Sequence, residues 1–87
     1  MVEVAYHSAF TKSVRKLPRA QQRKLAELIV FLQKNPYDRR LHTTHLSTPL
    51  LGVLSFRITR DWRVLFRFID TETVQLIDTA HRSEIYR

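Results

Sequence analysis

The chain has 87 residues, among them 15 Lys and Arg, 8 Asp and Glu, and no Cys, which gives a net charge of +7. We expect one domain over residues 1–87, and the missing cysteines exclude a disulfide framework and a thiolate metal site. No apolar run approaches the roughly 20 residues that cross a bilayer and the first residues lack a signal-peptide pattern, so we expect a cytoplasmic protein. The positive charge favours a polyanionic partner: nucleic acid, an acidic protein or an anionic membrane surface.

The first 18 residues predict a strand and a short helix. "VEVAY" at residues 2–6 alternates apolar and polar side chains, as a half-buried strand does. Ser8 is the expected N-cap of the helix, and Pro18 is expected to end it. The apolar stripe of this helix consists of Phe10, Val14 and Leu17. Three cations lie off the stripe, namely Lys12, Arg15 and Lys16. His7 has no evident role.

A second helix is predicted over residues 19–34 and forms an antiparallel hairpin with the first. "NPYD" at 35–38 ends it, because a residue before proline avoids the helical conformation. The predicted buried face consists of Leu25, Leu28, Ile29 and Leu32. The first turns carry Arg19, Arg23 and Lys24. Positive charge at a helix N-terminus opposes the macrodipole and so disfavours the helix. We therefore expect these cations to be present for a reason other than helix stability.

The second half predicts a loop and three strands. Residues 39–49 show no period and read as an extended loop, in which His42 has no evident role. Residues 51–59, 62–69 and 73–80 read as strands, with turns at 59–61 and 70–72. The order strand, helix, helix, three strands predicts an α+β domain (β-α-α-β-β-β) with its helices on one sheet face. The three later strands form an antiparallel meander, and the N-terminal strand is added at an edge or beside a central strand.

Strand register decides where the arginines of "FRITRDWRVLFRF" at residues 56–68 lie. A three-residue loop over 59–61 pairs Ile58 with Trp62, whereas a two-residue turn would mix charge into both faces. The odd loop gives one wholly apolar face, made of Leu54, Phe56, Ile58, Trp62, Val64, Phe66 and Phe68. The other face carries Val53, Ser55, Arg57, Arg63, Leu65 and Arg67. The pattern therefore gathers three arginines on the face away from the helices.

"LSTPLLGVLSFRITRDWRVLFRF" followed by "LIDTAHRSEIYR" resembles the RelE/ParE superfamily of bacterial toxin–antitoxin toxins. The resemblance covers nearly the whole chain, because the β-α-α-β-β-β order matches too. "DWRVLF" and "HRSEIY" are most similar to the RelE and YafQ ribonuclease branches. The resemblance implies a RelE-like fold and a metal-independent endoribonuclease (mRNA interferase). The enzyme would cut mRNA in the ribosomal A site. A cognate acidic antitoxin would inhibit it by forming a hetero-oligomer with it, and no membrane partner is expected.

The resemblance also implies a set of catalytic residues. Arg57 falls where YafQ-like toxins carry a catalytic histidine and RelE a lysine, and Asp61 matches an acidic residue of the YafQ pattern. Arg63 matches the arginine that follows the aromatic residue in RelE. Arg82 falls at a basic catalytic position, and Tyr86 at the terminal aromatic that stacks on or protonates the substrate.

The residue types suit RNA cleavage by the 2′-hydroxyl attacking the adjacent phosphate. Guanidinium groups stabilise the developing negative charge, but they cannot act as a base near neutral pH. The acid and base candidates are Asp61, His81, Tyr86 and His45, of which His81, as an imidazole, is best suited to either role. The predicted RNA contacts are Arg39, Arg40, His45, Arg60 and Arg67. The four histidines lack metal-ligand spacing, so we expect no metal and no cofactor.

Structural roles remain open for several of these residues. Asp61 is a natural turn residue, and Trp62 on the apolar face is expected in the core. Arg67 is placed to pair with Asp78 across the sheet. Two other functions also remain open: a ParE-like gyrase inhibitor without catalysis, and an inactive member that only binds antitoxin.

Overall fold

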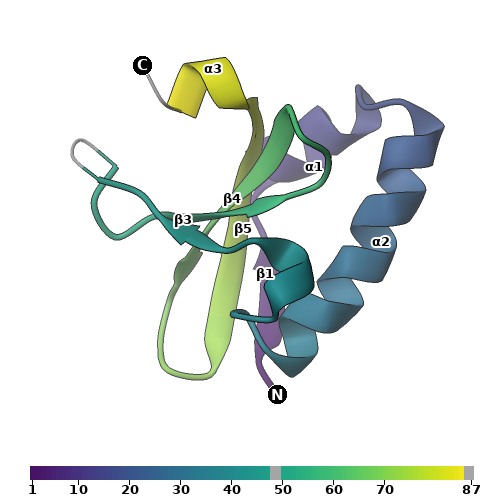
Figure 1. The fold of residues 1–87 in the computed structure, drawn as a ribbon. Coiled ribbons are helices and arrows are strands. Elements are labelled where there is room, and N and C mark those ends of the chain that lie inside the picture. Colours follow the sequence, from purple (N-terminus) through teal and green to yellow (C-terminus); the bar gives the residue numbers. More distant parts are fainter. Residues whose placement is uncertain (48–49, 86–87) are drawn as a thin grey trace.

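A computed structural model describes residues 1–47 and 50–85 of the chain. The fold is α+β, as the sequence predicted, and two helices lie on one side of a five-stranded sheet (Figure 1). In chain order the longer elements are β1 (Glu3–Tyr6), α1 (Ser8–Arg15), α2 (Arg19–Lys34), β3 (Leu54–Arg57), β4 (Trp62–Phe68) and β5 (Thr73–His81). In the described part, no helix is long and apolar enough to cross a bilayer.

Three short elements complete the fold: η1 (Arg39–Leu41), β2 (Thr44–His45) and α3 (Arg82–Ile85). Two of them lie in the segment 39–49, so the predicted extended loop was wrong for the part that the structure describes. Its residues form a 3₁₀ turn and then an edge strand that pairs with β3. Two residues of strand are too short to show a period, which is why the pattern missed them.

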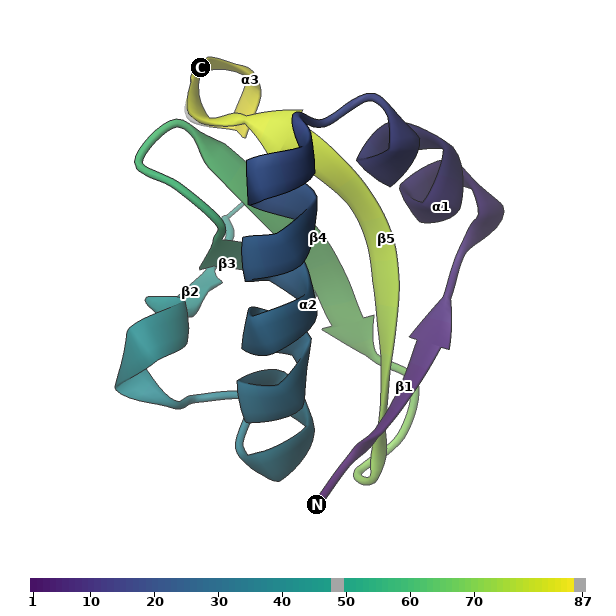
Figure 2. The ribbon, with the colours of Figure 1, turned by 90° about the vertical axis from the view of Figure 1, so that its right-hand side faces the viewer.

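The sheet is mixed, with the order β1-β5-β4-β3-β2. The β3–β4–β5 meander is antiparallel, whereas β1 lies at an edge and runs parallel to the first half of β5 (Figure 2). The predicted register of β3 and β4 is confirmed, since Leu54 lies opposite Phe66 and Phe56 opposite Val64. The Ile58 N–H donates to the Trp62 carbonyl at 2.9 Å, which closes the three-residue loop.

The core lies between the sheet and the two helices. The register places Phe56, Val64 and Phe66 on the helix-facing side, and each is fully buried. The remaining buried core residues are Phe10, Leu17, Leu25, Leu28, Leu32, Leu41, Leu54, Ile58, Val74 and Leu76. Trp62 is partly buried and packs against this core, in line with its predicted position on the apolar face. The sheet face away from the helices is thereby left to the arginines.

His7, rather than the predicted Ser8, is the N-cap of α1. Its backbone is extended, and its Nδ1 accepts a hydrogen bond from the Ala9 N–H at 3.1 Å. Ser8 is the first residue of the helix. The sequence suggested Ser8 because serine is a common cap and histidine is not, yet a neutral imidazole offers the same kind of acceptor.

His7→Ala should lower the free energy of unfolding by about 1 kcal/mol, because the Ala9 N–H loses its acceptor. His7→Asn should restore most of this loss, since an asparagine side chain caps the same donor. Urea denaturation of the three proteins at neutral pH measures the difference. Equal stability of the Ala and Asn variants would show that the cap contributes nothing.

Candidate active site

The most unusual pair in the sheet is Arg57 and Arg63, which lie directly opposite each other in β3 and β4. Directly opposed side chains share a face, with Cβ atoms about 5 Å apart, and like charges in that arrangement are destabilising. Arg63 is 6% exposed and Arg57 is partly buried. The two arginine side chains therefore start from adjacent points on one face of the sheet, and both have restricted access to water. We call the face that carries Arg57, Arg63 and Arg67 the arginine face.

Polar atoms on the arginine face are buried without a bonding partner. The Nε of Arg57 and the Oγ of Ser55 are both buried, and neither has a hydrogen-bond partner in residues 1–47 and 50–85. A buried donor left unsatisfied costs about 1–3 kcal/mol, and more when it is charged. An oxyanion would supply acceptors for such donors and offset the repulsion between the two arginines. The arrangement is therefore suited to bind an anion.

Asp61 and Arg82 meet at the end of the sheet beside this pair. The Arg82 N–H donates to the Asp61 carbonyl at 2.7 Å, which joins the start of α3 to the turn between β3 and β4. Both side chains are exposed. Four predicted catalytic residues thus come from neighbouring parts of one end of the sheet: Arg57, Asp61, Arg63 and Arg82.

His81 is at the same end, but its ring lies on the helix-facing side. It is opposite Trp62 and contacts the indole edge-on, with ring centroids 5.4 Å apart. Its Nδ1 accepts a hydrogen bond from the Ser83 N–H at 3.2 Å and lies 2.9 Å from the Ser83 Oγ. Glu84 accepts in turn from the His81 N–H at 3.3 Å. His81 therefore caps α3, and an acid–base role for it stays a prediction.

Arg67 does not pair with Asp78, so that prediction was wrong. Its Nε donates to the Gln75 Oε1 at 3.0 Å, and Gln75 is the residue directly opposite it. Asp78 instead accepts a short hydrogen bond from the Ser13 hydroxyl, which ties α1 to β5. Arg67 shares the face of Arg63, but it lies four positions further along β4, roughly 13 Å away. Arg60 is exposed in the turn before Asp61.

The other predicted RNA contacts lie away from the arginine pair. His45 is opposite Leu54 on the helix-facing side of the sheet, and its ring stacks on Tyr37 with centroids 5.8 Å apart. Arg39 is exposed in η1. Arg40 is exposed too, but it has intramolecular partners, so RNA binding by this group of residues stays a prediction.

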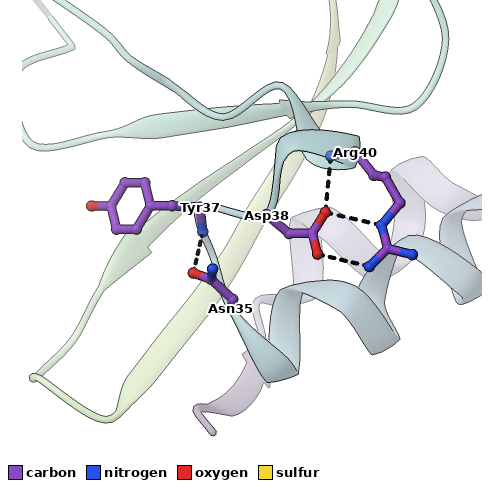
Figure 3. A network of polar contacts seen from close by, with 4 residues as sticks. All are labelled: Asn35, Tyr37, Asp38 and Arg40. Carbon is purple, nitrogen blue, oxygen red and sulfur yellow. Dashed lines mark hydrogen bonds and ion pairs between the residues drawn. The ribbon is translucent and has the colours of Figure 1, made fainter.

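Asp38 and Arg40 form a bidentate ion pair that closes the turn after α2 (Figure 3). The Arg40 Nε and Nη2 donate to the two carboxylate oxygens at 3.0 and 2.8 Å, and the Arg40 N–H donates at 2.9 Å. The guanidinium carbon lies 3.7 Å from the centre of the Phe31 ring. These hydrogen bonds lower the pKa of Asp38 from its ordinary 3.8 to about 2. Sequence reasoning missed this structural role.

The stabilising effect of the Asp38 carboxylate should depend on pH in a defined window. A carboxyl group with a lowered pKa stabilises the fold above its unfolded value, and this contribution is lost as pH falls towards the folded value. Asp38→Asn should therefore lower the Tm by a small, constant amount above about pH 4, and this difference should vanish as pH falls towards 2. Thermal melts across this range measure it, with Arg40→Gln as the partner variant. A difference that does not change below pH 4 would contradict the assignment.

The hydrogen bonds and ring contacts described above do not involve two further predictions, which concern Tyr86 and a metal site. Tyr86 lies outside the described residues, so nothing places its ring. Among residues 1–47 and 50–85, no group of three or more His, Asp or Glu side chains is arranged to hold a metal ion.

Ser55 was predicted to lie on the arginine face but had no assigned role. Its position two residues before Arg57, which puts both side chains on the same face of the strand, is the feature of the sequence that could have included Ser55 in the site.

No protein-family model matches the chain, and no curated protein matches its sequence. Solved structures do match. YafQ from Escherichia coli strain BL21(DE3) is 19% identical, with a TM-score of 0.74 and full coverage of both chains. A chain of the toxin–antitoxin complex RelBE2 from Mycobacterium tuberculosis is 25% identical, with a TM-score of 0.77 over 93% of this chain and 98% of that one. A chain of the archaeal RelE–RelB complex from Pyrococcus horikoshii is 22% identical, with a TM-score of 0.74 over 93% and 94%. These likenesses confirm, at the level of the fold, the resemblance inferred from the sequence.

Proposed function

We propose that this chain, which has the fold of the RelE/ParE toxin superfamily, is the toxin of a type II toxin–antitoxin pair. We further propose that it is an endoribonuclease that cuts mRNA on the ribosome without a metal ion and so inhibits translation. The observation that carries the ribonuclease proposal is the opposed pair Arg57 and Arg63, with buried guanidinium nitrogen on the face away from the helices.

RNA supplies its own nucleophile for this reaction. A base removes the proton of a 2′-hydroxyl, the oxygen attacks the adjacent phosphorus, and the bond to the 5′-oxygen breaks. The products are a 2′,3′-cyclic phosphate and a 5′-hydroxyl, whose oxygen takes up a proton. Negative charge grows on the non-bridging oxygens during the attack, and guanidinium groups fixed beside them stabilise the transition state without reorganising. Arg57 and Arg63 suit this task, and Arg82 lies at the adjacent end of the sheet.

The proton transfers need a different kind of group, because a guanidinium stays protonated near neutral pH. Asp61 is a described candidate at the same end of the sheet as the pair, because it lies in the turn that joins β3 to β4 and its carbonyl holds the start of α3. It is exposed and could accept the proton directly or through a water molecule. Tyr86 remains the proposed donor or stacking group, from its place in the sequence alone.

The decisive experiment is to map new RNA 5′ ends after a brief pulse of expression, together with cleavage of ribosome-bound mRNA by purified protein in excess chelator. Cuts within mRNA that persist in chelator support the proposal. Continued protein synthesis with accumulating DNA breaks would instead identify a gyrase poison. Intact mRNA, normal growth and tight antitoxin binding would identify an inactive member.

The proposed partner is an acidic antitoxin that covers the arginine face. Several similar structures are named as toxin–antitoxin complexes, which supports such a partner. Leu51 is 80% exposed in the turn that leads into β3, so it offers an apolar contact close in sequence to that strand. Covering the arginine face would block access to Arg57 and Arg63 and so prevent cleavage.

Antitoxin binding should weaken as salt rises, because much of the attraction is between the opposite net charges of the two proteins. Calorimetry of wild type and Arg63→Gln across a salt series measures this dependence. The variant should bind more weakly at low salt, and the two affinities should converge at high salt. If neither salt nor the Arg63 substitution changes the affinity, the antitoxin binds a surface other than the arginine face.

A further inference from the structure

A cavity of about 380 Å³ lies where the connection between α1 and α2 meets the sheet. Its walls come from α1, that connection, α2, β4 and β5, and none of the described residues assigned to the candidate active site lines it. Figure 2 shows the connection beside the end of β5 that leads into α3. The volume lies within the range of roughly 300–1,000 Å³ that is typical of small-molecule sites. We call this feature the hairpin cavity.

One wall of the hairpin cavity is apolar and partly aromatic. It consists of Leu17, Pro18 and Trp62. Leu17 is buried, whereas Trp62 is half-buried, because its indole packs against the core and also lines the cavity. Aromatic rings pack favourably against one another in offset or edge-on arrangements. This wall is therefore suited to the flat ring of an aromatic ligand.

A second wall carries a polar atom that the protein leaves unpaired. The Oε1 of Gln21 is buried and has no hydrogen-bond partner in residues 1–47 and 50–85. Gln21 is the third residue of α2, and a glutamine at this position ordinarily accepts a hydrogen bond from the N–H of the N-cap residue. The N-cap here is Pro18, which has no N–H to give. An N–H group of a ligand would supply the donor that the helix lacks.

The charge at the hairpin cavity favours an anion. Lys16 lines the cavity and is exposed, and no Asp or Glu of the described residues lines it. The carboxylate nearest in sequence to the lining residue Thr79 is that of Asp78, and it already has partners. It accepts hydrogen bonds from the Ser13 hydroxyl and from the Thr79 N–H, the latter at 2.8 Å. The ammonium group of Lys16 is thus open to a negatively charged ligand group.

We propose that the hairpin cavity binds a small aromatic carboxylate whose ring carries an N–H donor. The ring packs against Trp62, the ring N–H donates to the Gln21 Oε1, and the carboxylate faces the Lys16 ammonium. An indole carboxylate combines these three groups in one flat molecule. Such a site is additional to the proposed ribonuclease function and does not depend on it.

Proton–nitrogen correlation NMR of the full chain, titrated with indole-3-carboxylate, tests this proposal. The chain has a single tryptophan, so the indole N–H of Trp62 gives one unambiguous signal from the cavity. We expect this signal and the side-chain amide signals of Gln21 to shift and to saturate together. Indole-3-carboxamide, which lacks the charge, should bind about 2- to 5-fold more weakly. 1-Methylindole-3-carboxylate, which lacks the donor, should bind roughly 2- to 10-fold more weakly.

Two variants assign these differences to individual side chains. Lys16→Gln should abolish the difference between the carboxylate and the carboxamide, and Gln21→Met should abolish most of the difference between the indole and its methylated form. Gln21→Met should not lower the Tm, because it replaces an unpaired acceptor by an apolar group of similar shape. Lys34→Gln, at the far end of α2, is the matched control and should keep both differences.

Three outcomes would overturn the proposal. The first is a Trp62 signal that does not move or does not saturate with indole-3-carboxylate. The second is a preference for the carboxylate, or for the free ring N–H, that persists in the Lys16 and Gln21 variants. The third is a loss of antitoxin affinity in both variants without any loss of indole-3-carboxylate binding, which would make the cavity part of a protein interface. Cleavage of mRNA enters none of these measurements, so failure of the ribonuclease proposal would appear separately.

Discussion

Exchanging Arg57 for glutamine should lower the single-turnover rate of mRNA cleavage about 10²-fold, and Arg63→Gln should do the same or more. This is the usual scale for removing one fixed group that stabilises charge in a transition state. The Arg57 variant should also be more stable than the wild type, because the substitution removes one of two like charges that face each other across the ladder. Cleavage of ribosome-bound mRNA and thermal melts of the same preparations measure the two effects.

The matched control is Arg67→Gln, on the same face but bonded to Gln75 and distant from the pair. It should retain the wild-type rate within a few-fold. The double variant of Arg57 and Arg63 should lose less than the product of the two single losses, because the residues act on one phosphate. If Arg57→Gln cleaves at the wild-type rate, or if its loss merely follows a lower Tm, the pair is structural and the active site lies elsewhere.

Phe66→Ala should destabilise the protein by about 3–5 kcal/mol, the largest effect on stability that we expect from a single substitution. Phe66 is fully buried, and its ring lies 5.8 Å from that of Phe56 and 6.3 Å from that of Phe68. A domain of this size is stable by roughly 4–13 kcal/mol in total, so the variant should lose a large share of its stability. Urea denaturation measures the loss.

Two control variants distinguish the effect of a cavity at Phe66 from a general sensitivity of β4 and its neighbours to substitution. Phe66→Leu keeps most of the apolar volume and should cost roughly half as much. Ile69→Ala changes an exposed side chain just beyond β4 and should stay within about 0.5 kcal/mol of the wild type. A loss below about 1 kcal/mol for Phe66→Ala would mean that the sheet repacks around the missing ring.

The arginine face was predictable because it depends on local pattern. Side chains alternate with a period of two, and only an odd loop between β3 and β4 keeps Phe56 opposite Val64. The limits of α2 were predictable for a similar reason: a long apolar stripe runs between Pro18 and the "NP" at residues 35–36. Arg57 and Arg63 then had to face each other.

The position of His81 was not predictable, because a bulge in β5 reverses the alternation. Leu65 lies opposite Asp78 while Phe66 lies opposite Leu76, so Ile77 is an extra residue. Without it, the alternation that places Leu76 on the helix-facing side would put His81 on the arginine face. Nothing in "LIDTAH" marks this insertion. The partners of Asp38 and Asp78 were not predictable for another reason. Side-chain hydrogen bonds outside the strand pairing produce no periodic pattern in the sequence.

The parallel pairing of β1 with β5 bears on when the protein can fold. Glu3 lies opposite Thr73, so about 70 positions separate paired residues, and closing so long a loop costs roughly 2–3 kcal/mol more entropy than closing the turn between β4 and β5. The meander can form from near neighbours, but β1 and α1 have no strand to dock on until β5 exists. Arg63 likewise meets its β5 neighbour, Ala80, only then. A ribosome that makes this chain therefore completes most of it before β5, β1 and α1 can assemble beside the β3–β4 hairpin that carries the arginine pair, which postpones completion of the fold until synthesis of the domain is nearly finished.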